Sequence, residues 1–280
     1  MAEVRSRSGR TMPLDVRAVA LAFLGIAAVL VAQALAGVPV RALVQLEAAL
    51  IVFGGTLGAL VITHSISEVL ASARAVARTF RPSRDDTDAT TATILGLARR
   101  AHRRGLVSIE AELEGVGDPF LREGLMFALD ERSPDSVRDV LSVESSSRLS
   151  VEEAPARLLE SAAGYAPTFG ILGAVLGLIH VMRSLSTPGA LGGGIAVAFV
   201  ATVYGLGLAN LVLLPLAGRV REGAGRAARR RELMMHGICG IHQRIHPRLL
   251  AHRLRACTGR PVAVEPRPAG VQMQGERVPA

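Results

Sequence analysis

Two apolar stretches in the second half of the chain carry residues that could line a path for an ion. The stretch 162–183 contains Pro167, and the stretch 192–216 contains Thr202 and Pro215. A proline frees a backbone carbonyl within a helix, and a threonine hydroxyl offers an oxygen to a proton or cation. Neither stretch contains Asp or Glu, although an ion relay through a bilayer normally uses a buried carboxylate. If these helices line a path, a partner chain must supply the acid.

The same stretches present small residues at helical spacing. Small residues let membrane helices approach closely, so the simplest interpretation is that the two helices pack on each other. A face of this kind also leaves room for a partner helix. The residues concerned are Ala166, Gly170, Gly173, Ala174 and Gly177 on the first stretch and Gly194, Ala198, Ala201, Thr202, Gly205 and Ala209 on the second.

Composition and hydropathy favour a membrane protein. Half of the 280 residues are hydrophobic, tryptophan is absent and aromatic residues make up 3%, a composition that suits a helical bundle built from Leu, Val, Ala and Gly. A helix needs about 20 apolar residues to cross a bilayer. The sequence therefore predicts an all-α integral membrane protein with four transmembrane helices and a large helical cytoplasmic domain. The predicted spans are 18–36, 46–64, 162–183 and 192–216.

The first span has an alternative interpretation as a cleaved signal peptide, because "ALAG" at 34–37 resembles a small-residue cleavage site. Its apolar core is longer than that of a signal peptide, and another apolar run follows after a short gap. These features favour an out-and-back pair of spans. The true start could be Met12, because the residues that follow it already contain the whole span.

The net charge of +8 allows two interpretations, nucleic-acid binding and membrane topology. The arginines lie outside the apolar runs, where the positive-inside rule places cytoplasmic segments, so we expect no nucleic-acid partner. Both termini and the long middle loop are then cytoplasmic. The expected segments are an N-terminal tail (1–17), spans one and two (18–64), a large cytoplasmic helical loop (65–161), spans three and four (162–216), a basic helical tail (217–258) and a disordered C-terminus (259–280).

Capping residues divide the long loop into helices. An apolar face over 94–101 predicts a helix that Gly105 ends or bends. Asp118 followed by Pro119 predicts an N-cap and first helical position. Pro134, after Ser133, repeats this signature. A helix from about 151 should then lead directly into the third span.

The basic tail contains histidines and a cysteine that could suggest a metal site. Their spacing fits no standard zinc motif, and Pro247 interrupts the helix, so we expect no metal and no cofactor. A tail close to anionic lipid headgroups is the better interpretation, and His180 is interpreted as an interfacial residue rather than a proton relay. The tail residues concerned are His236, Cys239, His242, His246 and His252, and Cys239 and Cys257 imply no disulfide framework.

Three segments resemble the MotA stator subunits of bacterial flagellar motors, which belong with the TolQ and ExbB energisers in one proton channel family. They are "IVFGGTLGALV" (51–61), "GYAPTFGILGAVLGLIHVM" (164–182) and "GIAVAFVATVYGLGLANLVLLPLA" (194–217). The layout of two spans, a large loop, two spans and a basic tail is similar as well. The resemblance covers about residues 13–258.

This resemblance implies a stator subunit in the bacterial inner membrane. Such subunits form a ring of five around two copies of a MotB-like partner, whose single span carries the critical aspartate. Ion flow drives torque on a FliG-like rotor protein. The family's functional prolines match Pro167 and Pro215, and its channel threonine matches Thr202. Sodium-driven relatives have a second hydroxyl where this chain has Ala174, which favours protons.

The charged residues of the rotor contact that the resemblance implies match the family's pattern only in part. The family has an arginine three residues before a glycine and a glutamate five residues after it. Here Gly105 and Glu110 match, but His102 takes the place of the arginine, with Arg103 and Arg104 beside it. Either a neighbouring arginine substitutes for it, or the torque interface has changed.

Two other interpretations remain open at this point. An energiser of an outer-membrane or gliding system would share the physics, but the TolQ and ExbB class has three spans. A non-conducting scaffold would need neither Thr202 nor Pro167. An enzyme is not expected, because the sequence contains no nucleophile–base set, phosphate loop or metal motif.

Overall fold

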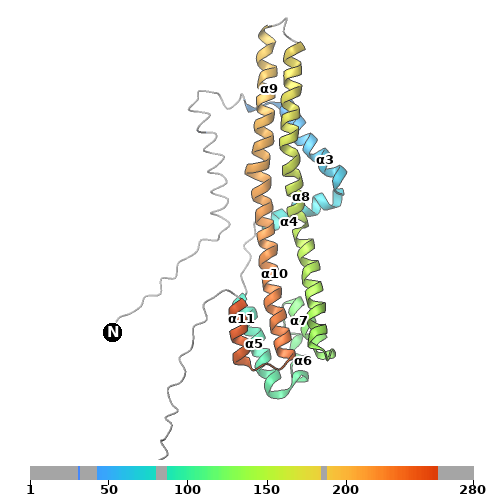
Figure 1. The fold of residues 1–280 in the computed structure, drawn as a ribbon, viewed down its shortest axis with the longest axis vertical. Helices are drawn as coiled ribbons and strands as arrows, with labels where there is room; N and C mark the ends of the chain where they lie inside the picture. The colour runs from blue at the N-terminus through green and yellow to red at the C-terminus, as the bar shows by residue number, and fades with distance from the viewer. Residues whose placement is uncertain (1–30, 32–42, 80–86, 184–187, 258–280) are drawn as a thin grey trace, which may run out of the picture. The chain divides into compact units, whose positions relative to one another are not determined.

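The computed structural model describes residues 31, 43–79, 87–183 and 188–257, which are helical with short connections. No strand occurs among these residues, so the predicted all-α fold is confirmed for them (Figure 1). Three of the described helices are long and apolar enough to cross a membrane. The first predicted span, 18–36, lies outside the described residues apart from residue 31.

Each of the three candidate spans is a continuous helical run. One consists of α2 (Leu46–Ala49), the π-helical η2 (Leu50–Gly54) and α3 (Gly55–Thr63). A second is the C-terminal part of the 50-residue α8 (Pro134–Arg183). The third runs through α9 (Pro188–Gly207) and π-helical η4 (Leu208–Leu213) into α10 (Leu214–His242).

The chain divides into two compact units. One comprises Met1–Asp85 and Glu144–Ala228, and the other comprises Asp86–Val143 and Arg229–Ala280. The first unit holds the apolar parts of the three candidate spans and α4 (Ile66–Thr79). Its helices α8 and α9 run side by side (Figure 1), and α3 packs on α8, where a Cβ on Gly55 would lie 2.2 Å from the ring of Phe169.

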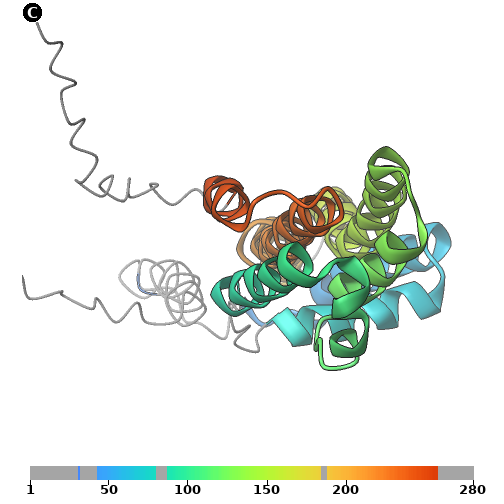
Figure 2. The same cartoon turned by 90° about the horizontal axis from the view of Figure 1, so that it is seen from below.

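The second unit is a small helical domain with one apolar core. It contains α5 (Thr87–Arg104), the 3₁₀ helix η3 (Leu106–Ile109), α6 (Glu110–Leu113), α7 (Pro119–Asp130), α11 (Pro247–Cys257) and the adjoining ends of α8 and α10. Helices α5 and α11 lie side by side in both views (Figures 1 and 2). The side chains at its centre are fully buried, and they include Ile94, Ile109, Leu125, Leu141, Leu233, Ile238, Leu250 and Leu254.

Local chemistry explains the helix boundaries of this unit. Gly105 has φ 87° and follows the last residue of α5, as glycine does at a helix C-terminus. The carboxylate of Asp118 accepts hydrogen bonds from the backbone N–H groups of Phe120 and Leu121, and Pro119 is the first helical residue of α7. The three boundaries predicted at Gly105, Asp118 and Pro134 are confirmed.

The helix expected from about 151 does lead directly into the third span, but its predicted start is wrong, because α8 runs without a break from Pro134 to Arg183. The segment 142–150 contains no glycine or proline that could end a helix. Ion pairs one turn apart support it, with Arg148 Nη2 lying 2.6 Å from Glu144 Oε1. Pro155 and Pro167 are both accommodated inside the helix.

Candidate functional site

The small-residue faces of α8 and α9 pack directly on each other. A Cβ on Gly205 would lie 2.6 Å from the carbonyl oxygen of Ala166, and one on Gly177 would lie 2.8 Å from the carbonyl oxygen of Gly194. Backbone atoms cannot rotate away as side chains do, so these contacts require glycine. The same face brings Gly170 to Ala201, Thr202 and Gly205, Gly173 to Ala201 and Ile51, and Gly177 to Ala198.

This packing decides between the two interpretations of the small-residue face. The prediction that the two helices pack on each other is confirmed by the contacts of Gly170, Gly177 and Gly205. The expectation that this face leaves room for a partner helix is wrong, because α9 itself fills the space. The surfaces of α8 and α9 that are exposed in the single chain are instead lined by larger side chains, such as Ile171, Val175, Phe199 and Val203.

Pro167 and Thr202 flank this close contact. A Cβ on Gly205 would lie 3.2 Å from Pro167 Cα, and one on Gly170 would lie 3.4 Å from Thr202 Cα. Both side chains are half-buried. The Thr202 hydroxyl donates a hydrogen bond to the carbonyl oxygen of Ala198, at 3.3 Å, and keeps its lone pairs for another donor or cation.

The other two predicted pathway residues lie further along the helices. Ala174 is half-buried on α8, one turn beyond Gly170. Pro215 is exposed on α10 and is separated from Thr202 by about 20 Å of helix, at about 1.5 Å per residue. The π-helical turn η4 lies between them, and π-helical turns occur frequently at functional sites. Pro167 and Thr202 are thus brought together, and Pro215 is not.

The predicted rotor-contact residues all lie on the surface of the second unit. His102, Arg103 and Arg104 form the exposed last turn of α5, and Glu110 is the exposed first residue of α6. The ring of His102 meets the ring of His246 edge to face, with 5.3 Å between their centres. These residues are free of the apolar core and available to a partner.

Glu110 also borders a surface cavity of about 600 Å³ within the second unit. Glu114 and Asp130 lie on the same cavity, and Arg122 is its only basic lining residue, so the formal charge of the lining is −2. The exposed side chain of Met126 adds an apolar surface. A cavity of this composition suits a basic, partly apolar partner segment.

The histidines of the basic tail have contacts of their own. His242 Nδ1 lies 2.8 Å from the carbonyl oxygen of Ala128, and His246 meets His102. Within the part of the chain that the structure describes, no three His, Cys, Asp or Glu side chains gather as a metal site.

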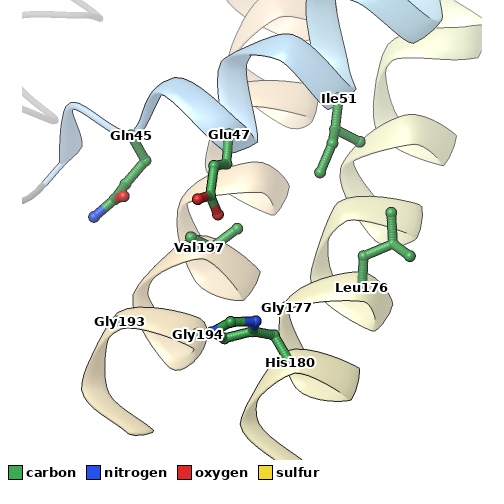
Figure 3. Close-up of a pocket in the computed structure, with 9 residues that line it drawn as sticks. All are labelled: Gln45, Glu47, Ile51, Leu176, Gly177, His180, Gly193, Gly194 and Val197. Atoms are coloured by element: carbon green, nitrogen blue, oxygen red, sulfur yellow. The ribbon is translucent and has the colours of Figure 1, made fainter. Parts of the chain in front are cut away.

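One acidic residue of the first unit, Glu47, belongs to none of the motifs recognised in the sequence. Glu47 is exposed in the first turn of α2, and together with His180 it borders a cavity in the first unit (Figure 3). The chain segment that carries Glu47 is tied to α9, because the Tyr204 hydroxyl donates to the carbonyl of Leu43 and accepts from the N–H of Gln45 at 3.4 Å. The signal in the sequence was available, since Glu47 is the single acid between residues 46 and 63.

Known proteins are similar to this chain in both sequence and fold. Residues 112–233 match the model of the MotA/TolQ/ExbB proton channel family. Motility protein A of Bacillus subtilis is 31% identical over 236 residues, which cover 82% of this chain and 86% of that protein. The flagellar MotAB stator complex of B. subtilis contains a chain 30% identical to this one, with a TM-score of 0.76, covering 85% of this chain and 93% of that chain.

A second solved structure, that of C. jejuni MotAB, has a TM-score of 0.80 and covers 87% of this chain and 95% of that chain. Its identity of 23% makes it a likeness of fold alone. The relationship to motility protein A extends over most of both chains, beyond the segment that the family model matches. The chain therefore belongs to the MotA/TolQ/ExbB proton channel family, and it is an inner-membrane protein of this channel and stator family rather than an enzyme.

Proposed function

We propose that this chain is the MotA-like stator subunit of a bacterial flagellar motor. With a MotB-like single-span partner it forms a proton-conducting complex that converts ion flow into torque. The observation that carries the proposal is that Pro167 and Thr202 both lie at the glycine contact between α9 and the acid-free part of α8 from residue 164 onward. The likeness to the flagellar MotAB stator complex supports the same assignment.

The partner supplies the missing carboxylate. Within the described spans, α8 from residue 164 onward and α9 with η4 contain no Asp or Glu, whereas proton relays through membranes are built around such groups. A partner helix with one aspartate, lying on the exposed side of the α8–α9 pair, completes the path. Several copies of this chain, five in our proposal, surround the partner helices.

We assign proton rather than sodium as the coupling ion. Sodium needs several oxygen ligands, whereas a proton needs only a relay. Ala174 offers no oxygen from its side chain, and Thr202 is the hydroxyl that remains beside the glycine contact.

The second unit is the part that acts on the rotor. Glu110, His102, Arg103 and Arg104 are exposed there and form a charged surface for a FliG-like rotor protein. In the proposed topology this unit and both termini are cytoplasmic, and the short connection between α8 and α9 is extracytoplasmic.

Swimming tests this proposal. The chain is co-expressed with its single-span genomic neighbour in a flagellated host that lacks its own stators. Thr202→Val and Pro167→Ala are expected to reduce swimming strongly. The matched controls are Thr168→Val, an exposed threonine whose hydroxyl is bonded to Tyr165 O, and Pro155→Ala, which lies elsewhere in α8. Normal swimming of both pathway variants would contradict the channel role.

A further inference from the structure

A cavity of about 330 Å³ lies in the first unit where α2, α8 and α9 meet (Figure 3). Its polar side chains are Gln45 and Glu47 at the start of the second span and His180 near the end of α8, and the backbones of Gly177, Gly193 and Gly194 also line it. This volume accommodates several water molecules, each of which takes about 30 Å³ in the liquid.

The cavity is lined by the carboxylate and the imidazole that the described spans contain. Within residues 46–63, 164–183 and 188–213, Glu47 is the only carboxylate and His180 the only imidazole, and both line this one space. Arg183, three residues beyond His180, is the only other formally charged group of those ranges. Ionisable residues within membrane spans generally mark ion pathways.

The packing holds these groups in place. A Cβ on Gly194 would lie 3.2 Å from His180 Cδ2 and 3.1 Å from the carbonyl oxygen of Gly177, so the glycines bring α9 close to the ring. On the other side, the Tyr204 hydroxyl accepts the hydrogen bond of Gln45 N–H, two residues before Glu47. The backbone near Glu47 and one edge of the His180 ring thus both lie close to α9, although both side chains are exposed in the single chain.

In Figure 3 the Glu47 carboxylate points toward α9, and the His180 ring projects from α8 toward Gly194. A carboxylate at the mouth of a cavity with low-dielectric walls raises the local concentration of cations. The His180 imidazole lines the same cavity, and its two ring nitrogens can donate or accept a hydrogen bond.

We propose that this cavity is the cation-collecting vestibule of the pathway, on the extracytoplasmic side, with Glu47 as the group that attracts cations and His180 as the group that exchanges protons. The inference rests on the proposed function, since a vestibule supplies a channel. It adds the route by which protons reach the α8–α9 pair.

Thiol labelling tests the vestibule without requiring conduction. A Cβ on Gly193 has no atom within 4 Å, so Gly193→Cys places a thiol in the cavity without a clash. The full chain with its partner is purified with Cys239 and Cys257 replaced by serine. Reaction with a cationic and an anionic methanethiosulfonate is then followed by the mass of this chain. A carboxylate within roughly 8 Å of the thiol favours the cationic reagent about fivefold.

This preference should disappear when Glu47→Gln is added. The matched control is Glu222→Gln, which should leave the preference unchanged. Glu222 is an exposed carboxylate paired with Arg226, and it lies about 40 Å from Gly193 along the helical run that contains both residues. Leu176→Cys, which also lines the cavity, serves as a second reporter if Gly193→Cys does not assemble. Equal reaction with both reagents, or a preference that survives Glu47→Gln, overturns the vestibule.

Proton flux separates the vestibule from the channel itself. In vesicles that contain the complex, Glu47→Gln and His180→Gln should each raise the proton concentration for half-maximal flux about twofold, with the maximal flux unchanged. If the proton concentration for half-maximal flux is unaltered in both variants, the vestibule is contradicted, but the proposed proton-conducting function is not. If the unmodified complex conducts no protons, the proposed function fails, and the vestibule's supply role fails with it.

Discussion

Gly205 of α9 lies so close to Ala166 of α8 that a Cβ on Gly205 would be 2.6 Å from the carbonyl oxygen of Ala166. The obstacle is backbone on a neighbouring helix, so a side-chain rotation cannot relieve it. Pro167 follows Ala166 directly, and its Cα would be 3.2 Å from the same Cβ. The spacing of the two helices at the proposed pathway is therefore set by this glycine.

We predict that Gly205→Ala separates α8 from α9 and lowers the stability of the first unit by about 1–3 kcal/mol, as overpacking of a close contact does. Gly207→Ala is the matched control, because a Cβ at Gly207 has no atom within 4 Å. The alanine there should be neutral or slightly stabilising in a helix. Thermal unfolding of the detergent-solubilised protein measures both, and equal midpoints for the two variants would refute the close contact.

The N-terminus of α7 provides a second prediction. The Asp118 carboxylate caps α7 and also accepts a hydrogen bond of 2.9 Å from Arg230 Nη2. Asp118→Ala should cost about 1–2 kcal/mol, because it removes a cap and a partly buried ion pair. Asp118→Asn keeps a capping oxygen, so it should cost less.

Arg230→Gln completes this test as a double-mutant cycle. Combined with Asp118→Asn, it should cost less than the sum of the two single variants, because each removes the same ion pair. Additive losses in the unfolding midpoint would show that the pair contributes no coupling.

Low pH should destabilise the segment that leads into the N-terminus of α8. Backbone N–H groups of Ser133 and Arg132 donate to the Glu131 carboxylate, and these hydrogen bonds, with a smaller contribution from His242, lower the pKa of Glu131. A lowered folded-state pKa means that the stabilisation is complete above the ordinary value of 4.5 and is lost as the pH falls through the folded value. Glu131→Gln should flatten the acid limb of the unfolding midpoint against pH. Asp139→Asn, an exposed carboxylate on α8, should leave that limb unchanged.

The two native cysteines should differ in reactivity. Burial raises the pKa of the half-buried Cys239 thiol, and the thiolate is the reactive form. Cys257 is exposed at the end of α11, although partial burial of its sulfur and the charge of Glu232 also raise its pKa. At neutral pH, a maleimide should therefore label Cys257 first. Loss of the fast phase in Cys239→Ser, rather than in Cys257→Ser, would reverse this order.

Local chemistry made several features of the fold predictable from sequence. Gly105 ends α5 because glycine adopts positive φ without strain, and Asp118 with Pro119 begins α7 because both residues suit a helix N-terminus. The glycines and alanines of the third and fourth spans indicated close helix packing by their spacing alone. Each of these signals is contained within one turn or one helix face.

The remaining features depend on contacts that a linear pattern does not specify. The small-residue face could have received either α9 or a partner helix, and the three-dimensional contact of Gly205 with Ala166 decided between them. The unbroken helix through 142–150 follows from the absence of any terminating residue, which is a weaker signal than a cap. The role proposed for Glu47 depends on a cavity that it lines together with His180, a residue far away in the sequence.

Proton flux through the complex is the most direct test of the central claim that this chain conducts protons with its partner. The complex is reconstituted in vesicles with a proton gradient in the absence of sodium, and internal pH is followed with a dye. We expect flux in the unmodified complex and in Thr168→Val, and at least a severalfold loss in Thr202→Val and Pro167→Ala. Absence of flux without sodium, or equal flux in all four proteins, would contradict it.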